Sequence, residues 1–391
     1  MSERMSAALS RIAASRTTAM TDRALALKAA GVDVIALSVG EPDFPTPPHV
    51  IAAAKAALDD GQTRYTAVPG TLALRQAAAR HFARDLGIET EAERVLVSAG
   101  GKQSIFLALL ATLDPGDEVL IPTPWWVSYP EIARFAGAAV VPLETTAANG
   151  FRITPDQLAA AITPRTRWLL LNSPGNPTGG VYAAADLAAL GEVIAAHPQV
   201  LVLSDDIYAP LRYDGTAHAT MAVVRPDLAE RVLTVSGVSK SHAMTGFRIG
   251  VATGPAWLIA AMTRLQSHAS GNAASLSQAA AVAAFDGPQD FLADWRLRLR
   301  ERRDRVVAAL NAIPGLSTPV PAGAFYCLVD AAPLAARFGG DDEALCLHLL
   351  DHGVALVAAS AFAGPFGFRL SFAAADDTLD EALRRIAKAL K

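Results

Sequence analysis

The sequence predicts an α/β protein with a mostly parallel sheet between helices and a second, smaller α+β domain. Two observations carry this prediction. Short β-branched or leucine-rich runs alternate with longer alanine-rich segments through most of the chain, which is typical of parallel strands connected by helices. After Gly287 a long charged helical pattern begins, and few strand-like runs follow it. The 391 residues are enough for two or three domains with substantial cores.

The expected elements follow in order along the chain. Strands are expected at 34–39, 94–98, 118–121, 139–142, 168–171, 200–204, 232–235 and 249–253. Helices are expected at 48–59, 71–86, 101–113, 184–197 and 255–267, several with a capping residue or an early proline. In the smaller domain, a helix over 291–310 leads to strands at 323–329 and 368–372, which helices separate, and to a last helix over 378–390.

Composition and charge exclude several classes of protein. Hydrophobic residues make up 52% and charged residues 18% of the chain, which is typical of a globular protein. The net charge of −4 gives no general attraction for nucleic acid or an anionic membrane. Two cysteines, Cys327 and Cys346, are too few for a disulfide framework or a four-cysteine zinc site. Residues 1–16 lack the apolar core of a secretory signal, so we expect a cytoplasmic protein.

Lys240 is the first candidate for chemistry, because it follows the expected strand at 232–235 in the run Ser-Gly-Val-Ser-Lys. A lysine that is partly desolvated and close to another cation loses its proton readily and becomes a Schiff-base nucleophile. Arg248 can supply that cation, and together with Ser236 it can hold a phosphate. The alternative is a surface lysine after a strand.

A second cluster, Ser-Asp-Asp-Ile-Tyr at 204–208, stands at the end of another apolar strand. Open α/β sheets bind their ligands at this carboxyl edge. A carboxylate from Asp205 can pair there with a protonated ring nitrogen of a cofactor, and Tyr208 can donate to a phenolic oxygen of that ring. The alternative is that Asp205 only caps a helix.

Two glycine-rich segments complete this edge of the sheet. The segment 171–180 is so dense in proline and glycine that Asn176 is expected to be a fixed hydrogen-bond donor rather than a mobile one. The segment 98–103 links a strand to a helix and includes Gly101 and Lys102, and free N–H groups at a helix start bind phosphate. Neither nucleotide-binding spacing, G-x-x-x-x-G-K-[ST] or G-x-G-x-x-G, is present.

Arg369 stands among apolar residues in the expected strand at 368–372. A buried arginine is costly unless it meets an anion, and a substrate carboxylate would satisfy it in a bidentate fork. An internal salt bridge is the alternative. The run Ser-Val-Gly-Glu-Pro-Asp-Phe at 38–44, which contains Gly40, is grouped with this residue as a candidate binding segment.

Other signals are set aside. His348 and His352 have the spacing of a zinc pair, but the glutamate of H-E-x-x-H and a third ligand are missing, so no metal is expected. The basic run at 296–305 is interrupted at helix spacing and is interpreted as a solvated helix face. No G-x-S-x-G is present for a serine acyl-enzyme.

Taken together, the motifs resemble the class I aminotransferases of the fold-type I pyridoxal-phosphate superfamily, and within it the bacterial aspartate aminotransferase subgroup. The resemblance runs from 9 to 369. Its motifs are Gly-Glu-Pro-Asp at 40–43, Arg-Tyr-Thr-Ala-Val-Pro-Gly at 64–70, Gly-Gly-Lys-Gln at 100–103, Trp-Val-Ser-Tyr-Pro at 126–130, Asn-Pro-Thr-Gly at 176–179, Ser-Asp-Asp-Ile-Tyr at 204–208, and the pair Lys240 and Arg248.

The resemblance implies a fold and an assembly. It implies a large cofactor-binding domain over 46–290 with a mostly parallel seven-stranded sheet. A small C-terminal domain would cover 291–391, and 1–45 would form an arm and part of the small domain. It also implies a homodimer in which Tyr65 of one subunit completes the site of the other.

The resemblance further implies a role for each matching residue around pyridoxal 5′-phosphate. Lys240 would bond the cofactor and move the proton during transamination. The other implied cofactor contacts are Asp205 at the ring nitrogen, Tyr208 and Asn176 at the phenolic oxygen, Trp126 stacked on the ring, and Gly101, Lys102, Ser236, Arg248 and Tyr65 around the phosphate. The implied substrate contacts are Gly40, Trp126, Asn176 and Arg369, with Thr17 and Lys102 at a distal carboxylate.

The expected reaction is transamination between an L-amino acid and a 2-oxo acid, with aspartate and 2-oxoglutarate as the expected pair. Aromatic, alanine or prephenate specificity and a fold-type I lyase remain alternatives. A ligand-sensing regulator on this fold would need a fused DNA-binding domain, and we expect none, because the chain has no room for one and no basic N-terminal module. The chain departs from many relatives at Gly237, three before the lysine, where they carry serine, so either Ser236 or Ser239 is the serine that contacts the phosphate. It also departs at Asp206, where glutamate is commoner, and at Trp125, where tyrosine or phenylalanine is commoner.

Overall fold

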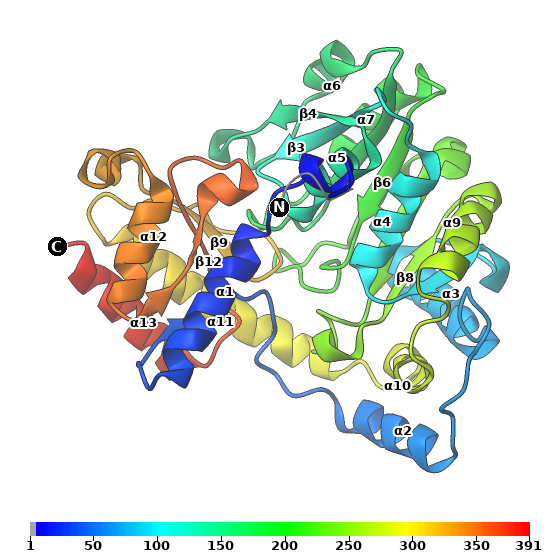
Figure 1. Ribbon diagram of the computed structural model, residues 1–391, viewed down its shortest axis with the longest axis horizontal. Helices are drawn as coiled ribbons and strands as arrows, with labels where there is room; N and C mark the ends of the chain where they lie inside the picture. Colours follow the sequence, from blue (N-terminus) through cyan, green and yellow to red (C-terminus); the bar gives the residue numbers. More distant parts are fainter. Residues whose placement is uncertain (1–4) are drawn as a thin grey trace.

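The computed structural model describes residues 5–391, and its largest element is a seven-stranded sheet with the order β2-β8-β7-β6-β5-β3-β4. Strand β8 is antiparallel to both of its neighbours, and the remaining pairs are parallel. The predicted fold class is therefore confirmed (Figure 1). The strands are β2 (Val95–Ser98), β3 (Glu118–Thr123), β4 (Ala139–Glu144), β5 (Thr166–Asn172), β6 (Leu201–Asp205), β7 (Val232–Gly237) and β8 (Gly250–Thr253).

Helices cover both faces of this sheet because successive strand residues point to opposite faces. In β5, Trp168 and Leu170 pack with α4, α5 and α9, whereas Leu169 and Leu171 pack with α6 and α7 on the other side. Helices α3 and α10 cover β2 and β8. The helices of this part are α2 (Pro48–Asp59), α3 (Leu72–Leu86), α4 (Gly101–Thr112), α5 (Ser128–Ala136), α6 (Pro155–Ala161), α7 (Ala184–Ala195), α8 (Met221–Val224), α9 (Ala256–Ala269) and α10 (Ser275–Asp286).

The C-terminal part forms a second, α+β unit. Strands β11 (Val357–Ala358), β12 (Gly367–Ser371) and β9 (Tyr326–Asp330) form an antiparallel sheet. Helices α11 (Phe291–Asn311), α12 (Asp342–Asp351) and α13 (Asp376–Ala389) contribute to its core. The N-terminal helix α1 (Arg16–Ala29) joins the same core, and Figure 1 shows it beside the C-terminal elements. The predicted boundaries at 45 and 290 stay a prediction.

One expected strand lies outside the large sheet. The run at 34–39 yields only β1 (Ile35–Ala36), which pairs in parallel with β10 (Val354–Ala355) of the C-terminal part. Its neighbours Val34 and Leu37 are buried in the C-terminal core. An apolar run predicts a strand but not the sheet that the strand joins. Helices α1, α5, α6, α8 and α10 were not predicted, whereas α12 lies between the strands at 323–329 and 368–372, where helices were expected.

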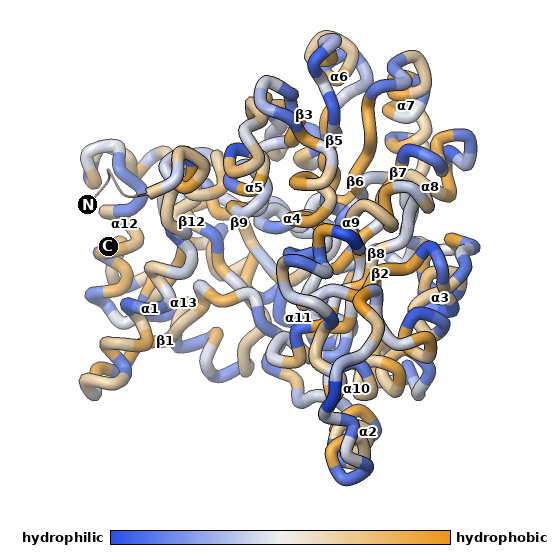
Figure 2. Tube along the Cα trace, turned by 45° about the vertical axis from the view of Figure 1, so that its right-hand side comes forward, coloured by the Kyte–Doolittle hydropathy of each residue, from blue (hydrophilic) through white to orange (hydrophobic). Residues whose placement is uncertain are grey.

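The chain buries its apolar segments and exposes its polar ones. Strands of the large sheet such as β6 begin with a run of hydrophobic residues, whereas hydrophilic residues lie mainly on outer turns and helix surfaces (Figure 2). No helix in residues 5–391 has the length and apolar composition that a membrane crossing needs. Cys327 and Cys346 are both buried and unpaired with one another.

The parallel strands end at one edge of the sheet, and the functional loops begin there. This edge carries the start of α4 after β2, Trp126 after β3, Asn172 at the end of β5, Asp205 at the end of β6 and Lys240 after β7. The order of the strands therefore gathers these residues from distant parts of the sequence, as open α/β sheets generally do.

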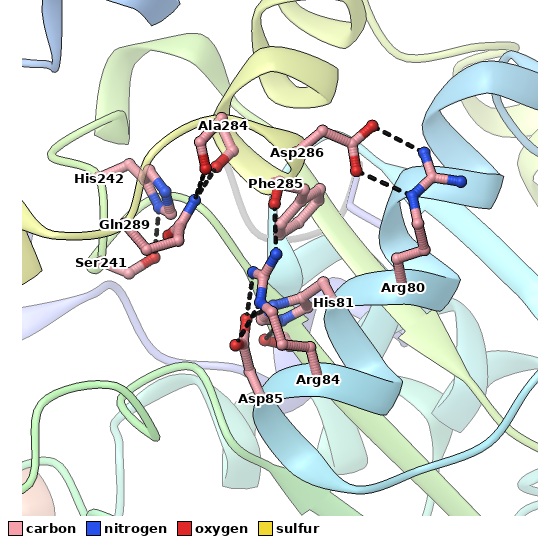
Figure 3. A network of polar contacts seen from close by, with 12 residues as sticks. Arg80, His81, Arg84, Asp85, Ser241, His242, Ala284, Phe285, Asp286 and Gln289 are labelled. Atoms are coloured by element: carbon pink, nitrogen blue, oxygen red, sulfur yellow. Dashed lines mark hydrogen bonds and ion pairs between the residues drawn. The ribbon is translucent and has the colours of Figure 1, made fainter.

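Polar contacts surround α3, the end of α10 and the two residues that follow Lys240, Ser241 and His242 (Figure 3). On α3, His81 Nδ1 lies 2.6 Å from Asp85 Oδ2, and Arg84 donates to the carbonyl of Phe285 at 2.8 Å. His242, two residues after Lys240, lies 2.8 Å from Ser241 Oγ through Nδ1. Arg84 thus joins α3 to the end of α10, and His81 Nε2, which lies 2.9 Å from Ser236 Oγ, joins α3 to β7, the strand that precedes Lys240.

His242 is expected to make the free energy of unfolding of the protein depend on pH. Burial lowers the pKa of His242 to about 4, below its ordinary value near 6.5. The stability that its neutral form preserves is therefore present above pH 6.5 and is lost as the pH falls toward 4. We predict that His242→Gln removes about 2 kcal/mol from the decrease in unfolding free energy between pH 7 and pH 5, measured by urea denaturation. The matched control is His268→Gln at an exposed position, and an unchanged pH dependence in His242→Gln contradicts the prediction.

Candidate active site

A cavity of about 370 Å³ lies at the carboxyl edge of the sheet, between the large sheet, α1 and the C-terminal strands. It brings together every residue predicted for the site except Ser236 and Tyr65. The predicted residues on its wall are Thr17, Gly40, Gly101, Lys102, Trp126, Asn176, Asp205, Tyr208, Lys240, Arg248 and Arg369.

Lys240 is held as an unprotonated amine more readily than an ordinary lysine. Its Nζ donates to the carbonyl oxygen of Gly40 at 2.5 Å. Burial lowers the pKa of Lys240 to about 8, and the charges of Arg248 and Arg369 act in the same direction. An amine with this pKa is available as a nucleophile and as a base near neutral pH.

Asp205 is buried on the wall of the cavity. Its Oδ2 accepts from the hydroxyl of Tyr129 at 2.6 Å, and its Oδ1 accepts from the N–H of Ile207 at 3.3 Å. Burial raises the pKa of Asp205 to about 6, while the bond from Tyr129 opposes this rise. A cationic ring nitrogen placed beside this carboxylate would stabilise its charged form.

The start of α4 and Arg248 form an anion-binding corner. Gly100, with φ of +89°, precedes α4, and a Cβ on it would lie 2.3 Å from Arg248 Nη2. Only glycine therefore lets the guanidinium approach the free N–H groups of the helix. Lys102 also faces the cavity, with Nζ 4.9 Å from the centre of the Trp126 ring, and burial followed by the charge of Arg248 lowers the pKa of Lys102.

Arg369 on β12 is 3% exposed and has no carboxylate partner within residues 5–391. Its Nη1 donates to Asn176 Oδ1 at 3.0 Å and its Nη2 to the carbonyl of Ser38 at 2.5 Å, while Nε has no partner. The internal salt bridge considered as the alternative is thus not formed. A buried guanidinium with only neutral acceptors is suited to a ligand carboxylate.

Two predicted residues lie away from the cavity. Ser236 faces α3 instead, where its Oγ lies 2.9 Å from His81 Nε2, and Ser239 lines the cavity. The phosphate contact predicted for Ser236 does not fit this position, because β7 turns its side chain toward the helix layer. Tyr65 is 98% exposed, outside the cavity of its own chain.

Sequence reasoning missed several residues of the wall. Tyr129 and Tyr326 are buried and hydrogen-bonded to Asp205 and Tyr208, respectively. Tyr129 lies in the predicted motif 126–130, but its direction could not be inferred without knowing that α5 starts there. Tyr326 stands in an apolar run that read as strand core.

The chain can be compared with known proteins at this point. The profile of the family described as aminotransferase class I and II matches residues 32–386. The chain belongs to this family. Among its relatives, the aspartate/prephenate aminotransferase of Cereibacter sphaeroides is 48% identical over 98% of this chain and 97% of its own length. The aspartate aminotransferase of Rhizobium meliloti is 48% identical over 97% of this chain and 95% of its own.

Solved structures of class I and II aminotransferases agree with this assignment. An aspartate aminotransferase from Rhizobium meliloti has a TM-score of 0.94 at 46% identity, with coverage of 99% of this chain and 98% of that one. The enzyme from Thermus thermophilus with maleate has a TM-score of 0.93 at 40% identity, with coverage of 99% of both chains. The chain is a pyridoxal-phosphate-dependent aminotransferase with the fold-type I architecture.

The side chains of this aminotransferase fit pyridoxal phosphate. The cavity offers an amine of lowered pKa at Lys240, a buried carboxylate at Asp205, and an anion-binding corner at Arg248 and the start of α4. The unpartnered Nε of Arg369 leaves a donor for a second anion. No group of three or more histidine, cysteine, aspartate or glutamate side chains in residues 5–391 is arranged to hold a metal ion.

Tyr129 is predicted to keep Asp205 ionised. Removing its hydroxyl in Tyr129→Phe removes a hydrogen bond to a charged group and raises the pKa of Asp205 by about 1 to 2 units. Infrared difference spectra of the cofactor-free protein, with Asp205→Asn as the reference, measure this pKa from the carboxyl band. The matched control is Tyr182→Phe, whose hydroxyl bonds the backbone of Ile153 instead. An equal pKa in the wild type and Tyr129→Phe rules the role out.

Proposed function

We propose that this enzyme transfers an amino group between L-aspartate and 2-oxoglutarate, giving oxaloacetate and L-glutamate. The observation that carries the proposal is the pair of cations in one cavity, the guanidinium of Arg369 and the ammonium of Lys102. Arg369 is to bind the α-carboxylate, and Lys102 with Thr17 of α1 is to bind the distal carboxylate. A dicarboxylic substrate satisfies both cations, whereas alanine or phenylalanine leaves one unpaired. The names of the relatives from Rhizobium meliloti and Cereibacter sphaeroides support this assignment.

Pyridoxal phosphate supplies a ring that accepts the electron pair released at the substrate α-carbon. In our proposal, Lys240 bonds the cofactor, and Asp205 pairs with the ring nitrogen. The remaining contacts are to be made by Tyr208 and Asn176 at the phenolic oxygen, Trp126 on the ring face, and Gly101, Lys102, Ser239 and Arg248 at the phosphate, of which Ser239 replaces Ser236.

Proton transfer falls to Lys240 in this scheme. With a pKa near 8, its amine would take the proton from the substrate α-carbon, hold it on Nζ and give it up again during transfer of the amino group. Gly40 and Asn176 hold the α-carboxylate together with Arg369, so the Cα–H bond is kept in reach of Nζ.

A second candidate acceptor is prephenate, because the relative from Cereibacter sphaeroides is named as an aspartate/prephenate enzyme. Prephenate also carries two carboxylates, so the same two cations can recognise it. Prephenate differs from 2-oxoglutarate in the ring whose carbon carries the distal carboxylate, and the cavity must accommodate this ring.

The test is a single-substrate half-reaction followed through the colour of the bound cofactor. We expect stoichiometric conversion to the amine form by aspartate and glutamate, at least about tenfold faster than by alanine, phenylalanine or tyrosine. Prephenate is then supplied to the amine form in the reverse direction. Lys102→Gln is expected to reduce the preference by about tenfold, and Lys240→Ala to abolish conversion, whereas Lys55→Ala on α2 behaves as the wild type. Equal rates with all amino acids overturn the specificity, and no conversion overturns the transaminase assignment.

We propose, in addition, that the enzyme is a homodimer in which Tyr65 reaches the partner's phosphate site. Tyr65 is almost fully exposed, as expected for a side chain that acts outside its own chain. A second cavity of about 500 Å³, lined by residues 12–16 and by α4 and α5, shares Lys102 and Arg248 with the first. It provides a path by which a partner's loop can reach the phosphate corner.

Mixed dimers test this arrangement. Tyr65→Ala and Lys240→Ala are each expected to lose most activity, and unfolding and refolding them together is expected to restore about one quarter of the wild-type activity. The reason is that half of the dimers are hybrids, and each hybrid has one intact site. Mixing Lys240→Ala with Asp205→Ala gives no restoration if both residues serve their own chain's site. Failure of the Tyr65 mixture to exceed the unmixed variants contradicts the shared site.

A further inference from the structure

Tyr326 on β9 lies between a candidate cofactor residue, Tyr208, and the candidate carboxylate residue, Arg369. It is 1% exposed and belongs to the C-terminal core, yet its side chain also lines the cavity. It contacts the candidate cofactor residue Tyr208 and the candidate carboxylate residue Arg369. No reaction step described above uses it.

The hydroxyl of Tyr326 is bonded only to Tyr208 among residues 5–391. The two phenol oxygens lie 2.9 Å apart, and either can be the donor. Tyr208 has a single proton, so when it donates to a ligand oxygen, its own oxygen is left to accept from Tyr326. A donor that also accepts is polarised and donates more strongly. Tyr326 therefore sets both the direction and the strength of the bond that Tyr208 makes.

The ring of Tyr326 covers one face of Arg369. The guanidinium carbon lies 4.6 Å from the centre of the Tyr326 ring and 4.8 Å from that of Phe362, so aromatic rings cover it twice. These rings attract the cation and leave its edges free for hydrogen bonds. The edges point to Asn176 and Ser38, where a carboxylate is to bind.

The backbone at Gly40 is shaped around the same tyrosine. A Cβ at position 40 would lie 2.1 Å from the Tyr326 oxygen, which no side chain can accommodate. Because Gly40 has no side chain, the segment between α1 and α2 can pass close to the Tyr326 hydroxyl. The same residue accepts a hydrogen bond at its carbonyl from Lys240 Nζ.

We propose that Tyr326 is a positioning residue with two separable parts: its hydroxyl tunes the cofactor bond of Tyr208, and its ring orients Arg369 for the carboxylate. The proposal rests on the roles given above to Tyr208 and Arg369. It assigns a function to a strand residue that couples the C-terminal unit to the large sheet.

Three variants separate the two parts. Tyr326→Phe removes the hydroxyl and keeps the ring, Tyr326→Leu removes both, and Phe362→Leu removes only the opposite ring. Two readouts need no turnover: the pH midpoint of the cofactor colour change without substrate, and the dissociation constant of maleate, a dicarboxylate that cannot be transaminated. Circular dichroism and the melting temperature show whether each variant folds.

The hydroxyl is expected to act on the pH midpoint alone. A weaker donor at Tyr208 leaves more negative charge on the phenolic oxygen, which holds the neighbouring proton on the Lys240 nitrogen more tightly. We expect Tyr326→Phe to raise the midpoint by about half a pH unit and to leave maleate binding within about twofold of the wild type. The charged groups that act on Lys240 are unchanged in the variant; they are Glu41, Arg248, Arg369 and Asp205.

The ring is expected to act on maleate. Phe362→Leu weakens maleate binding roughly three- to tenfold without moving the midpoint, and Tyr326→Leu shows both effects. An unmoved midpoint in Tyr326→Phe, or maleate binding in Tyr326→Leu equal to that in Tyr326→Phe, overturns the proposal. If Tyr326→Leu does not fold, Tyr326→Met takes its place, because it also removes both the hydroxyl and the ring. Failure of the aspartate assignment is distinguishable, since it is seen in the wild-type half-reaction and leaves the midpoint test intact.

Discussion

The site depends on charged groups that are buried apart from their natural counter-charges. Arg369 has only neutral acceptors, Asp205 is held by a phenol and a backbone N–H, and Lys240 donates to a carbonyl. Each of these groups would be more stable in water or in an ion pair. The rest of the fold must therefore hold these side chains apart, so that they do not pair with one another. A ligand with complementary charges can then form the ion pairs that the protein itself does not make.

The charged side chains are kept apart because they come from different sheets of the protein. The large sheet delivers Asp205 and Lys240 at one edge, and the C-terminal sheet delivers Arg369 from β12. The arm between α1 and α2 lies between them, and its carbonyls at Ser38 and Gly40 accept from Arg369 and Lys240. Lys240 and Arg369 thus both donate to carbonyl oxygens of one backbone segment. A neutral carbonyl is a weaker acceptor than the substrate carboxylate that is expected at Arg369.

Much of the site could be predicted from the sequence, because strand ends in a parallel sheet converge whatever the details of packing. Lys240, Asp205 and Asn176 were placed at one edge from their positions after apolar runs alone. The choice between neighbouring residues could not be made in the same way. Ser236 and Ser239 differ in which side of β7 they face, and a strand that ends in a turn loses its simple alternation. The run at 34–39 read as a strand of the large sheet for a similar reason, since periodicity carries no information on partners.

The two adjacent acids at 205 and 206 show what distinguishes a functional carboxylate from a structural one. Asp206 is 1% exposed, accepts from Ser204 Oγ at 2.9 Å and has His218 Nε2 at 3.4 Å, so its polar neighbours lie within the protein. Asp205 has no basic partner at such a distance and is left facing the cavity. The negative charge of Asp206 adds to the effect of burial and raises the pKa of Asp205, whereas the hydroxyl of Tyr129 lowers it. The carboxylate that faces the cavity is therefore the one whose protonation its neighbours can adjust, and the order of the two acids in the sequence does not show which of them that is.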